Sequence, residues 1–221
     1  MVEVYAVNIT EPLTEMRFEH FRSLLSMEKQ ERISRFRYPN DVKRTLYGDV
    51  LIRYLVKQKL MIPNNQMEFG QNEYGKPFLK GYPVFHYNIS HAGNWVICAV
   101  SSQPIGVDIE EIKPIDLEIA KRYFARSEYN SIISNPADRR QTIFYHFWTA
   151  KESYIKYDGR GLSIPLNSFS VLNNGVDQYK VDLDNRCFIQ TVETLKGYVL
   201  SICQNTMGMV IQKVQLGEIE I

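Results

Sequence analysis

The order of helical and strand patterns repeats along the chain, and this repetition limits the folds that the sequence can adopt. Each half begins with a strand pattern, continues with apolar residues at helical spacing and ends with alternating strand patterns. These stretches cover residues 2–9, 14–60 and 84–101 in the first half, and 105–110, 116–157 and 169–204 in the second. We therefore expect an α+β protein whose two units have a similar layout and meet near residue 104.

Several residues indicate where these elements begin or turn. Ser26 and Asn40 are of types that cap helix N-termini, so we expect a helix to begin at each of them. The "HAGN" stretch at 91–94 has the length of a hairpin connection. Asn174 and Gly175 tolerate the positive φ angles of a type I′ turn and predict a second hairpin around them. Both halves therefore combine helices with antiparallel strand pairs.

Composition narrows the class of protein. With 221 residues, of which 44% are hydrophobic, the chain is large enough to bury its own core. The formal net charge is +1, so an anionic ligand must be held by a local cluster rather than by a global field. Three widely separated cysteines and the lack of a long apolar run are typical of a soluble protein of the reducing cytoplasm. We expect a cytoplasmic protein with no nucleic-acid and no membrane partner.

Two carboxylates stand close together in the strand pattern at 105–110. Asp108 and Glu110 point to the same face of a strand, and Gly106 on that face leaves open space beside them. One interpretation is an amphipathic strand whose polar face is exposed to water. The other is a site for a hard divalent cation, because Mg²⁺ binds a few carboxylate oxygens together with water and substrate phosphates.

A third acid lies in the helical stretch at 138–157. Glu152 and Lys156 follow Trp148 at intervals of four residues, on a row beside the apolar stripe. Glu152 therefore borders the buried side of the helix. It is either one partner of an ordinary Glu–Lys surface pair or a third ligand of the same cation.

A basic cluster lies in the first half of the chain. Residues 26–53 hold seven basic and four acidic side chains. Lys29 and Arg32 are about one helical turn apart and can point the same way. The segment is either a solvated helix face of mixed charge or a surface that binds phosphate groups through charge-assisted hydrogen bonds.

Two connections carry further candidate binding residues. Gly75 permits a turn in the "EYGKPF" stretch, from which Lys76 projects. Ser90 and His91 lie at the tip of the first predicted hairpin. Neither a Ser-His-Asp order nor an HxxxH spacing accompanies them, so they do not by themselves indicate a triad hydrolase or a zinc site.

Taken in order, these motifs resemble the signature motifs of the 4′-phosphopantetheinyl transferases. "GVDIE" and "FWTAKESYIK" carry the resemblance, with Asp108 and Glu152 44 positions apart. It extends through "SMEKQERISRF", "RTLYGDVLIR", "EYGKPF", "NISHAGNWV" and "GLSIPLNSFSV", and is closest to the longer, Sfp-type members.

The resemblance implies a reaction and an architecture. The reaction is Mg²⁺-dependent transfer of the 4′-phosphopantetheine arm of coenzyme A to a serine of an apo carrier protein, with release of adenosine 3′,5′-bisphosphate. Peptidyl and acyl carrier proteins of peptide, polyketide and fatty-acid synthetases are the implied partners. The architecture is a monomer of two similar α+β subdomains related by pseudo-twofold symmetry. Residues 1–104 would hold the nucleotide side of coenzyme A, and residues 105–221 the metal site and the carrier docking surface.

The same resemblance assigns roles to individual residues. Mg²⁺ would be bound by Asp108, Glu110 and Glu152. The nucleotide and its phosphates would be lined by Lys29, Arg32, Thr45, Lys76, Ser90 and His91. Lys156 would lie beside the pyrophosphate and act in catalysis with Glu152, which is a candidate base for the carrier serine alongside a metal-bound water. Close relatives can carry Lys where this chain has Arg32, and a planar guanidinium contacts phosphate differently from an ammonium group.

Two other functions remain open. One is a binding module for coenzyme A or carrier proteins that has kept the fold without catalysis, and the other is a metal-dependent phosphohydrolase. The three acids together with Lys151 and Lys156 favour a transferase over a binding module. The resemblance would place the carrier near residues 116–124 and after Lys156, where Tyr157 and Leu162 are candidate contacts.

Overall fold

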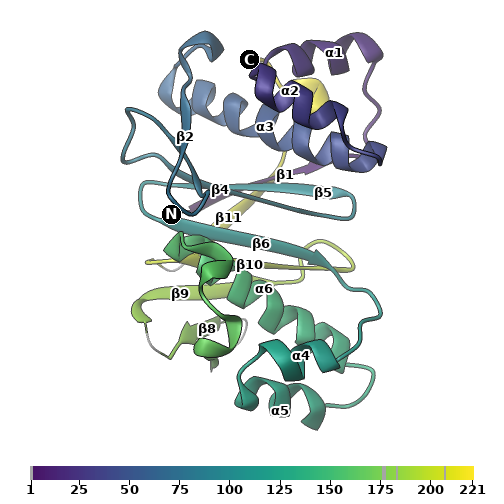
Figure 1. Cartoon of the computed structure of the whole chain (residues 1–221), viewed down its shortest axis with the longest axis vertical. Helices are drawn as coiled ribbons and strands as arrows, with labels where there is room; N and C mark the ends of the chain where they lie inside the picture. The colour runs from purple at the N-terminus through teal and green to yellow at the C-terminus, as the bar shows by residue number, and fades with distance from the viewer. Residues whose placement is uncertain (1, 176–177, 183, 207) are drawn as a thin grey trace.

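The computed structural model describes residues 2–175, 178–182, 184–206 and 208–221. Two groups of helices lie at opposite ends of the molecule, with two sheets packed between them (Figure 1). The first half contains β1 (Val2–Asn8), α1 (Glu15–Ser23), α2 (Met27–Ser34), α3 (Pro39–Leu60), η1 (Asn64–Gln66), β2 (Phe69–Gln71), β3 (Pro77–Leu79), β4 (His86–Ala92) and β5 (Trp95–Ser101). The second half contains β6 (Ile105–Glu111), α4 (Glu118–Tyr123), α5 (Arg126–Ser134), α6 (Arg140–Asp158), η2 (Gly161–Ser163), η3 (Leu166–Ser168), β7 (Val171–Gly175), β8 (Gln178–Val181), β9 (Asp184–Val192), β10 (Tyr198–Gln204), β11 (Met209–Lys213) and η4 (Leu216–Glu218). This order confirms the predicted α+β class.

The helices of the first half begin at or near the predicted residues, with one correction. α1 follows Thr14, whose Oγ1 accepts a hydrogen bond from the Arg17 amide at 3.3 Å. α2 follows Ser26, as predicted. The prediction that Asn40 caps the next helix is wrong, because α3 already begins at Pro39. Proline suits the first helical position, since its φ angle is preset and an N–H there would lack an intrahelical partner.

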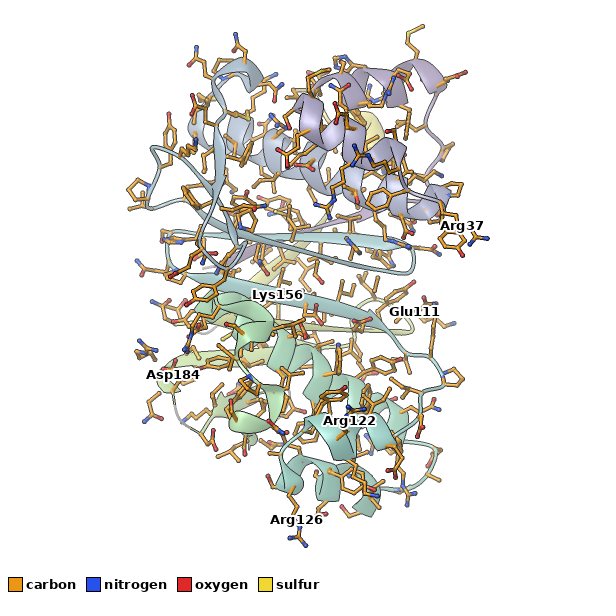
Figure 2. The ribbon with its side chains drawn as sticks, in the orientation of Figure 1. Arg37, Glu111, Arg122, Arg126, Lys156 and Asp184 are labelled. Carbon is orange, nitrogen blue, oxygen red and sulfur yellow. The ribbon has the colours of Figure 1, made fainter. Side chains whose placement is uncertain are left out.

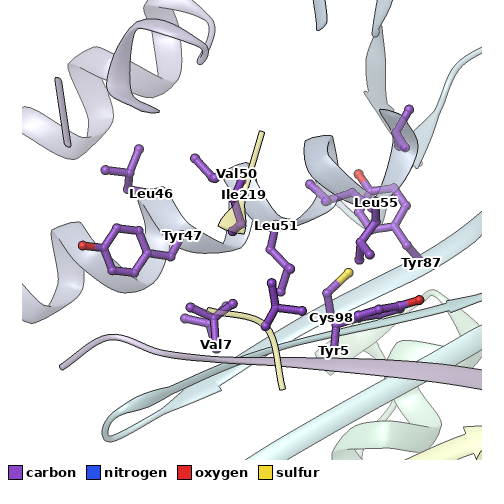
Figure 3. Close-up of a cluster of buried hydrophobic side chains, with 14 of the residues drawn as sticks. Tyr5, Val7, Leu46, Tyr47, Val50, Leu51, Leu55, Tyr87, Cys98 and Ile219 are labelled. Atoms are coloured by element: carbon purple, nitrogen blue, oxygen red, sulfur yellow. The ribbon is translucent and has the colours of Figure 1, made fainter. Parts of the chain in front are cut away.

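The first half has its core between α3 and a sheet with the strand order β11-β1-β5-β4. Leu51 and Leu55 of α3 lie over Tyr5 of β1 and Cys98 of β5 (Figure 3). Burying a leucine side chain fully contributes about 1.5–3 kcal/mol, so this face of α3 anchors the helix to the sheet. In the part of the chain that the structure describes, all three cysteines are buried and free.

The second half has a sheet with the order β6-β10-β9-β8-β7, which α6 covers on one face. The hairpin predicted around residues 174–175 is confirmed, because β7 pairs with β8 in antiparallel orientation. β9 and β10 also pair antiparallel. The turn predicted at Asn174 and Gly175 is placed too early, since Gly175 is the last residue of β7 and pairs with Gln178. A register shift between Asn173 and Gly175 moves the strand end, and residues 176–177 of the connection lie outside the described residues.

The two sheets pack against each other through a third, apolar cluster. Ile105, Val107 and Ile109 of β6 face buried residues of β1 and β5 such as Val4 and Ile97. This confirms the predicted alternation of β6, because its other face carries the polar residues. The two halves are therefore packed against each other through apolar side chains.

The edge strands β4 and β6 meet at this contact and are joined by side chains. The amide of Val107 donates to Oδ1 of Asn88 at 2.8 Å, and the amide of Ile109 donates to Oγ of Ser90 at 3.3 Å. These bonds satisfy backbone donors at the free edge of β6, which would otherwise be buried without partners. They also place Ser90 of the first half directly beside Asp108.

The end of the chain returns to the first half. β11 runs parallel to β1, from Val2 opposite Met209 to Ala6 opposite Lys213. Leu216 and other residues after this strand then complete the core below α3. The division into residues 1–104 and 105–221 stays a prediction, but residues after about 209 pack with the first half. Over the described ranges, no helix is long and apolar enough to cross a membrane.

Candidate active site

Polar residues from three elements gather where the two halves meet. β4 contributes Ser90, β6 contributes Asp108 and Glu110, and α6 contributes Glu152 and Lys156. Figure 2 shows Lys156 at the level of β6, between the two ends of the molecule. The structure thus brings together side chains that are up to 66 positions apart in the sequence.

Asp108 is the centre of this group and is only 4% exposed. Its Oδ1 accepts hydrogen bonds from Lys156 Nζ at 2.6 Å and from Ser90 Oγ at 2.8 Å. Lys156 Nζ also donates to Ser90 Oγ at 3.1 Å, so each of the three groups is hydrogen-bonded to the other two. The other carboxylate oxygen of Asp108, Oδ2, is buried and has no hydrogen-bond partner among the described residues. A buried carboxylate oxygen without a partner is costly, so this atom calls for an explanation.

The prediction that Gly106 leaves open space beside the carboxylates is wrong. A Cβ atom at this position would overlap the carbonyl oxygen of Ser153 and the amide nitrogen of Tyr157. The backbone of α6 therefore fills the space, and only glycine allows so close an approach of helix and strand. This contact brings Glu152 and Lys156 onto the polar face of β6.

The remaining two acids are affected by burial and by Asp108. Burial, and then the charge of Asp108, raises the pKa of Glu110 to about 7, while Lys156 and a hydrogen bond with Trp148 act in the opposite direction. Burial and Asp108 likewise raise the pKa of Glu152 above its usual range. The three acids therefore lie within electrostatic reach of one another. In the described parts of the chain, however, no three His, Cys, Asp or Glu side chains already converge into a group able to hold a metal ion.

Lys29 and Arg32 line a basic pocket of about 350 Å³ in the first half. Lys29 forms an ion pair with Asp49, and its amine also lies 5.8 Å from the ring centre of Phe69. Arg53 also lines the pocket; it is 6% exposed, and its guanidinium lies 5.1 Å from the centre of the same ring. Part of the mixed charge of this segment therefore lines a cavity, whereas Glu31 and Arg35 pair on an exposed helix face.

Thr45 belongs to the same helix as Arg53, which lines the pocket, and Asp49, which pairs with Lys29. The sequence interpretation gave neither of these two residues a role of its own. Asp49 and Arg53 follow Thr45 on α3 at intervals of four residues, which places the three on one helix face. The Nε atom of Arg53 is buried without a hydrogen-bond partner among the described residues. The four-residue spacing is the signal that could have linked these residues to Thr45.

Lys76 does not point freely into solvent. Its amine donates to the carbonyl of Ile105 at 3.0 Å and to that of Tyr157 at 3.1 Å. Burial lowers the pKa of Lys76 to about 8. The side chain thus crosses from the β2–β3 hairpin of the first half to the second half.

His91 lies at the rim of a polar cavity of about 320 Å³ that also includes Arg44 and Glu110. Burial lowers the pKa of His91, and the positive charges of Arg44 and Lys156 act in the same direction. Arg44 donates to the carbonyl of Gly93 at 2.8 Å. Arg44 is a candidate site residue that the motif comparison did not single out, and its position one residue before Thr45 was the available signal.

Lys151 has a different environment from Lys156, although both are on α6. It is fully buried, pairs with Glu128 at 2.9 Å and donates to the carbonyls of Leu166 and Phe169 at 2.8 and 2.7 Å. Its use as an argument for catalysis is therefore wrong, because the amine is occupied inside the core of the second half.

An apolar groove of about 900 Å³ lies next to the acids. Ile119 and Tyr123 of α4 line it, together with Trp148 and Leu162. Leu162 is 76% exposed, whereas Tyr157 is half-buried and lies in another cavity. Trp148 connects this groove to the acids through its hydrogen bond with Glu110.

Both halves of the chain are similar to known proteins. A family model described as the N-terminal part of 4′-phosphopantetheinyl transferase matches residues 11–103, and the 4′-phosphopantetheinyl transferase superfamily model matches residues 104–203. The chain is 43% identical over 205 residues to 4′-phosphopantetheinyl transferase Sfp of Bacillus subtilis (strain 168), covering 91% of this chain and 92% of that protein. It is 37% identical over 224 residues to 4′-phosphopantetheinyl transferase gsp of Aneurinibacillus migulanus, covering 99% and 94%.

Among solved structures, a holo-(acyl-carrier-protein) synthase from Bacillus anthracis in complex with CoA matches 45% of this chain and 92% of that chain, with 19% identity and a TM-score of 0.38. The family assignment depends on the two family models and on the relatives that match most of the chain. The chain belongs to the 4′-phosphopantetheinyl transferases and is an enzyme of the Sfp type.

Proposed function

We propose that the enzyme transfers the 4′-phosphopantetheine arm of coenzyme A to a serine hydroxyl of an apo carrier protein. A bond forms between the serine oxygen and the phosphorus next to the pantetheine, and the bond from that phosphorus to the bridging oxygen breaks. Adenosine 3′,5′-bisphosphate leaves, and the serine proton passes to a base. The observation that carries the proposal is the meeting of Asp108, Glu110, Glu152 and Lys156 where the two halves join.

The acids suit a hard divalent cation such as Mg²⁺. Asp108 keeps one buried oxygen without a partner among the described residues, and Glu110 and Glu152 lie within its electrostatic reach. A cation held by these three residues would relieve their mutual repulsion. When bound, Mg²⁺ would supply charge neutralisation at the pyrophosphate oxygens.

The side chains of the second half would position the reacting groups. Lys156 contacts Asp108 and Ser90, and from this place its ammonium group can bind the leaving phosphate and donate a proton to it. Glu152 precedes Lys156 by one helical turn, which places the two side chains next to each other on α6. We assign its carboxylate as the group that accepts the proton of the carrier serine. Phosphoryl transfer depends mainly on such positioning and on neutralisation of developing charge.

The first half would bind the nucleotide. Lys29 and Arg32 line the basic pocket, and Thr45 lies on the helix that also carries Asp49 and Arg53. Lysine and arginine donate charge-assisted hydrogen bonds to phosphate oxygens, which suits this pocket to a phosphate of coenzyme A.

The apolar groove is the proposed docking surface for the carrier protein. It is lined by α4 and by the segment around Leu162, and Trp148 connects it to the acids. An amphipathic helix of a carrier protein would bury its apolar face there and bring its serine toward Glu152. Because both halves of the site come from one chain, we propose that the enzyme works as a monomer. Three free, buried cysteines are consistent with a cytoplasmic location.

The decisive experiment is to incubate the purified protein with an apo peptidyl carrier protein, coenzyme A and Mg²⁺, and to measure the intact mass of the carrier. A single added phosphopantetheine that disappears with a chelator and in Asp108→Asn supports both the transfer and the metal site. Bisphosphate release should equal carrier modification.

The two alternatives give different results in the same experiment. A binding module would bind coenzyme A without any change in carrier mass. A phosphohydrolase would release bisphosphate when the carrier is omitted. Either result would contradict the proposed function.

A further inference from the structure

The turn that connects β2 and β3 is held by hydrogen bonds within the turn itself. Oδ1 of Asn72 accepts hydrogen bonds from the amides of Tyr74 at 3.0 Å and Lys76 at 2.8 Å, and the Asn72 amide donates to the carbonyl of Lys76 at 2.9 Å. Gly75 has a φ angle of +87°, which a glycine adopts without strain. The turn therefore presents the Lys76 side chain in a defined direction.

This turn is bonded to the second half by three hydrogen bonds. Lys76 Nζ donates to the carbonyls of Ile105 and Tyr157 at 3.0 and 3.1 Å, and Asn72 Nδ2 donates to the carbonyl of Gly159 at 2.9 Å. Ile105 is the first residue of β6, while Tyr157 and Gly159 lie at the end of α6. One lysine thus connects both elements that carry the acids.

The hydrogen bonds from Lys76 and Asn72 to the end of α6 suit the partial negative charge that a helix carries there. The last four carbonyls of an α-helix lack intrahelical partners and carry partial negative charge. A cation at this end therefore stabilises the helix. Lys76 is half-buried beside these carbonyls, and the lowered pKa of its amine reflects the same burial.

We propose that Lys76 is a positioning residue that holds the end of α6 against the start of β6, and that it acts on catalysis through Lys156 and Asp108. Lys156 directly precedes Tyr157, and Asp108 lies three residues after Ile105. The inference rests on the transferase function proposed above. It replaces the role that the resemblance gives to Lys76, which is contact with the nucleotide.

The test compares Lys76→Met, Lys76→Arg and Lys80→Met. Methionine keeps the aliphatic part of the side chain but removes the ammonium group with its charge and donors, whereas arginine can still donate to two carbonyls. Lys80 is a matched control on the same hairpin, because it is exposed and pairs with Glu68 at 3.7 Å on the surface. Three quantities are measured: kcat for carrier modification, the Kd of adenosine 3′,5′-bisphosphate by calorimetry, and hydrogen exchange of the amides at 153–159.

A positioning role predicts a specific combination of results. In Lys76→Met, kcat should fall about tenfold or more, because small displacements of catalytic groups reduce rates strongly, while the Kd of the bisphosphate changes less than about threefold. The amides at 153–159 should exchange faster than in the wild type. Lys76→Arg should recover most of kcat, and Lys80→Met should match the wild type in every measurement.

Two results would overturn the inference. A bisphosphate Kd that weakens about tenfold with an unchanged kcat would make Lys76 a nucleotide ligand. Unchanged kcat and unchanged exchange in Lys76→Met would remove any positioning role. If the wild type modifies no carrier, the transferase proposal fails and the exchange measurement alone decides the role of Lys76. If Lys76→Met does not fold, Asn72→Asp keeps the turn acceptor, removes the donor to Gly159 and should increase exchange at the same amides.

Discussion

Lys156 Nζ lies 2.6 Å from Oδ1 of Asp108, and the same amine reaches Ser90 of the other half of the molecule at 3.1 Å. Asp108 is 4% exposed, so its charge depends on this contact for compensation. Lys156 therefore has a structural role that is separate from any role in the reaction, and the two roles can be measured independently.

Lys156→Met should abolish carrier modification and destabilise the protein by about 2–3 kcal/mol in chelator, because a buried carboxylate loses its cation. The double variant Lys156→Met/Asp108→Asn should regain most of this stability, since the uncompensated charge is removed, but it should remain inactive. Urea unfolding and intact carrier mass measure the two effects. A double variant as unstable as Lys156→Met would contradict the ion-pair explanation.

Gly106→Ala should destabilise the protein by about 3 kcal/mol, because its Cβ would overlap backbone atoms of α6 that cannot move aside without shifting the helix. Gly217→Ala is the matched control, since open space surrounds that glycine among the described residues. Urea unfolding of the two variants tests this. Equal stabilities would mean that α6 is not held this close to β6.

Periodicity could predict the faces of the site-bearing elements. The two-residue alternation of β6 placed Asp108 and Glu110 on one face and Ile109 on the apolar contact between the sheets. The four-residue spacing of α6 likewise placed Glu152 and Lys156 in one row. These properties depend on the local backbone conformation, which a short stretch of sequence determines.

Contacts between distant segments could not be predicted in this way. Lys76 bonds Tyr157, 81 positions further along the chain, and Gly106 is close to α6 only because the helix returns over β6. Lys151 and Lys156 have the same chemistry and lie on the same helix, but one is buried in a core and the other faces Asp108. Which face of α6 is covered depends on long-range packing.

Lys29→Ala should weaken the binding of adenosine 3′,5′-bisphosphate about tenfold or more, because a charge-assisted hydrogen bond contributes about 1.5–3 kcal/mol. The remaining binding should depend less on salt, since one charge has been removed. Stability should change by less than about 1 kcal/mol, because the ion pair with Asp49 is partly exposed. Calorimetry at two salt concentrations measures both effects. Lys196→Ala, an exposed lysine, is the control, and equal affinities in the two variants would separate the basic pocket from nucleotide binding.

Lys151→Met should destabilise the protein by about 3–5 kcal/mol, because Glu128 would remain as a buried charge without its cation. The variant Lys151→Met/Glu128→Gln should recover much of this loss, since a neutral amide still accepts from the amide of Val171, which lies 2.7 Å from Glu128 in the wild type. Lys151 touches carbonyls of the segment that forms one wall of the apolar groove, at Leu166 and Phe169. The folded double variant should therefore show a higher KM for the carrier protein and an unchanged KM for coenzyme A. Urea unfolding and steady-state kinetics measure these effects, and a selective loss of kcat with both KM values unchanged would return Lys151 to the chemistry of the site.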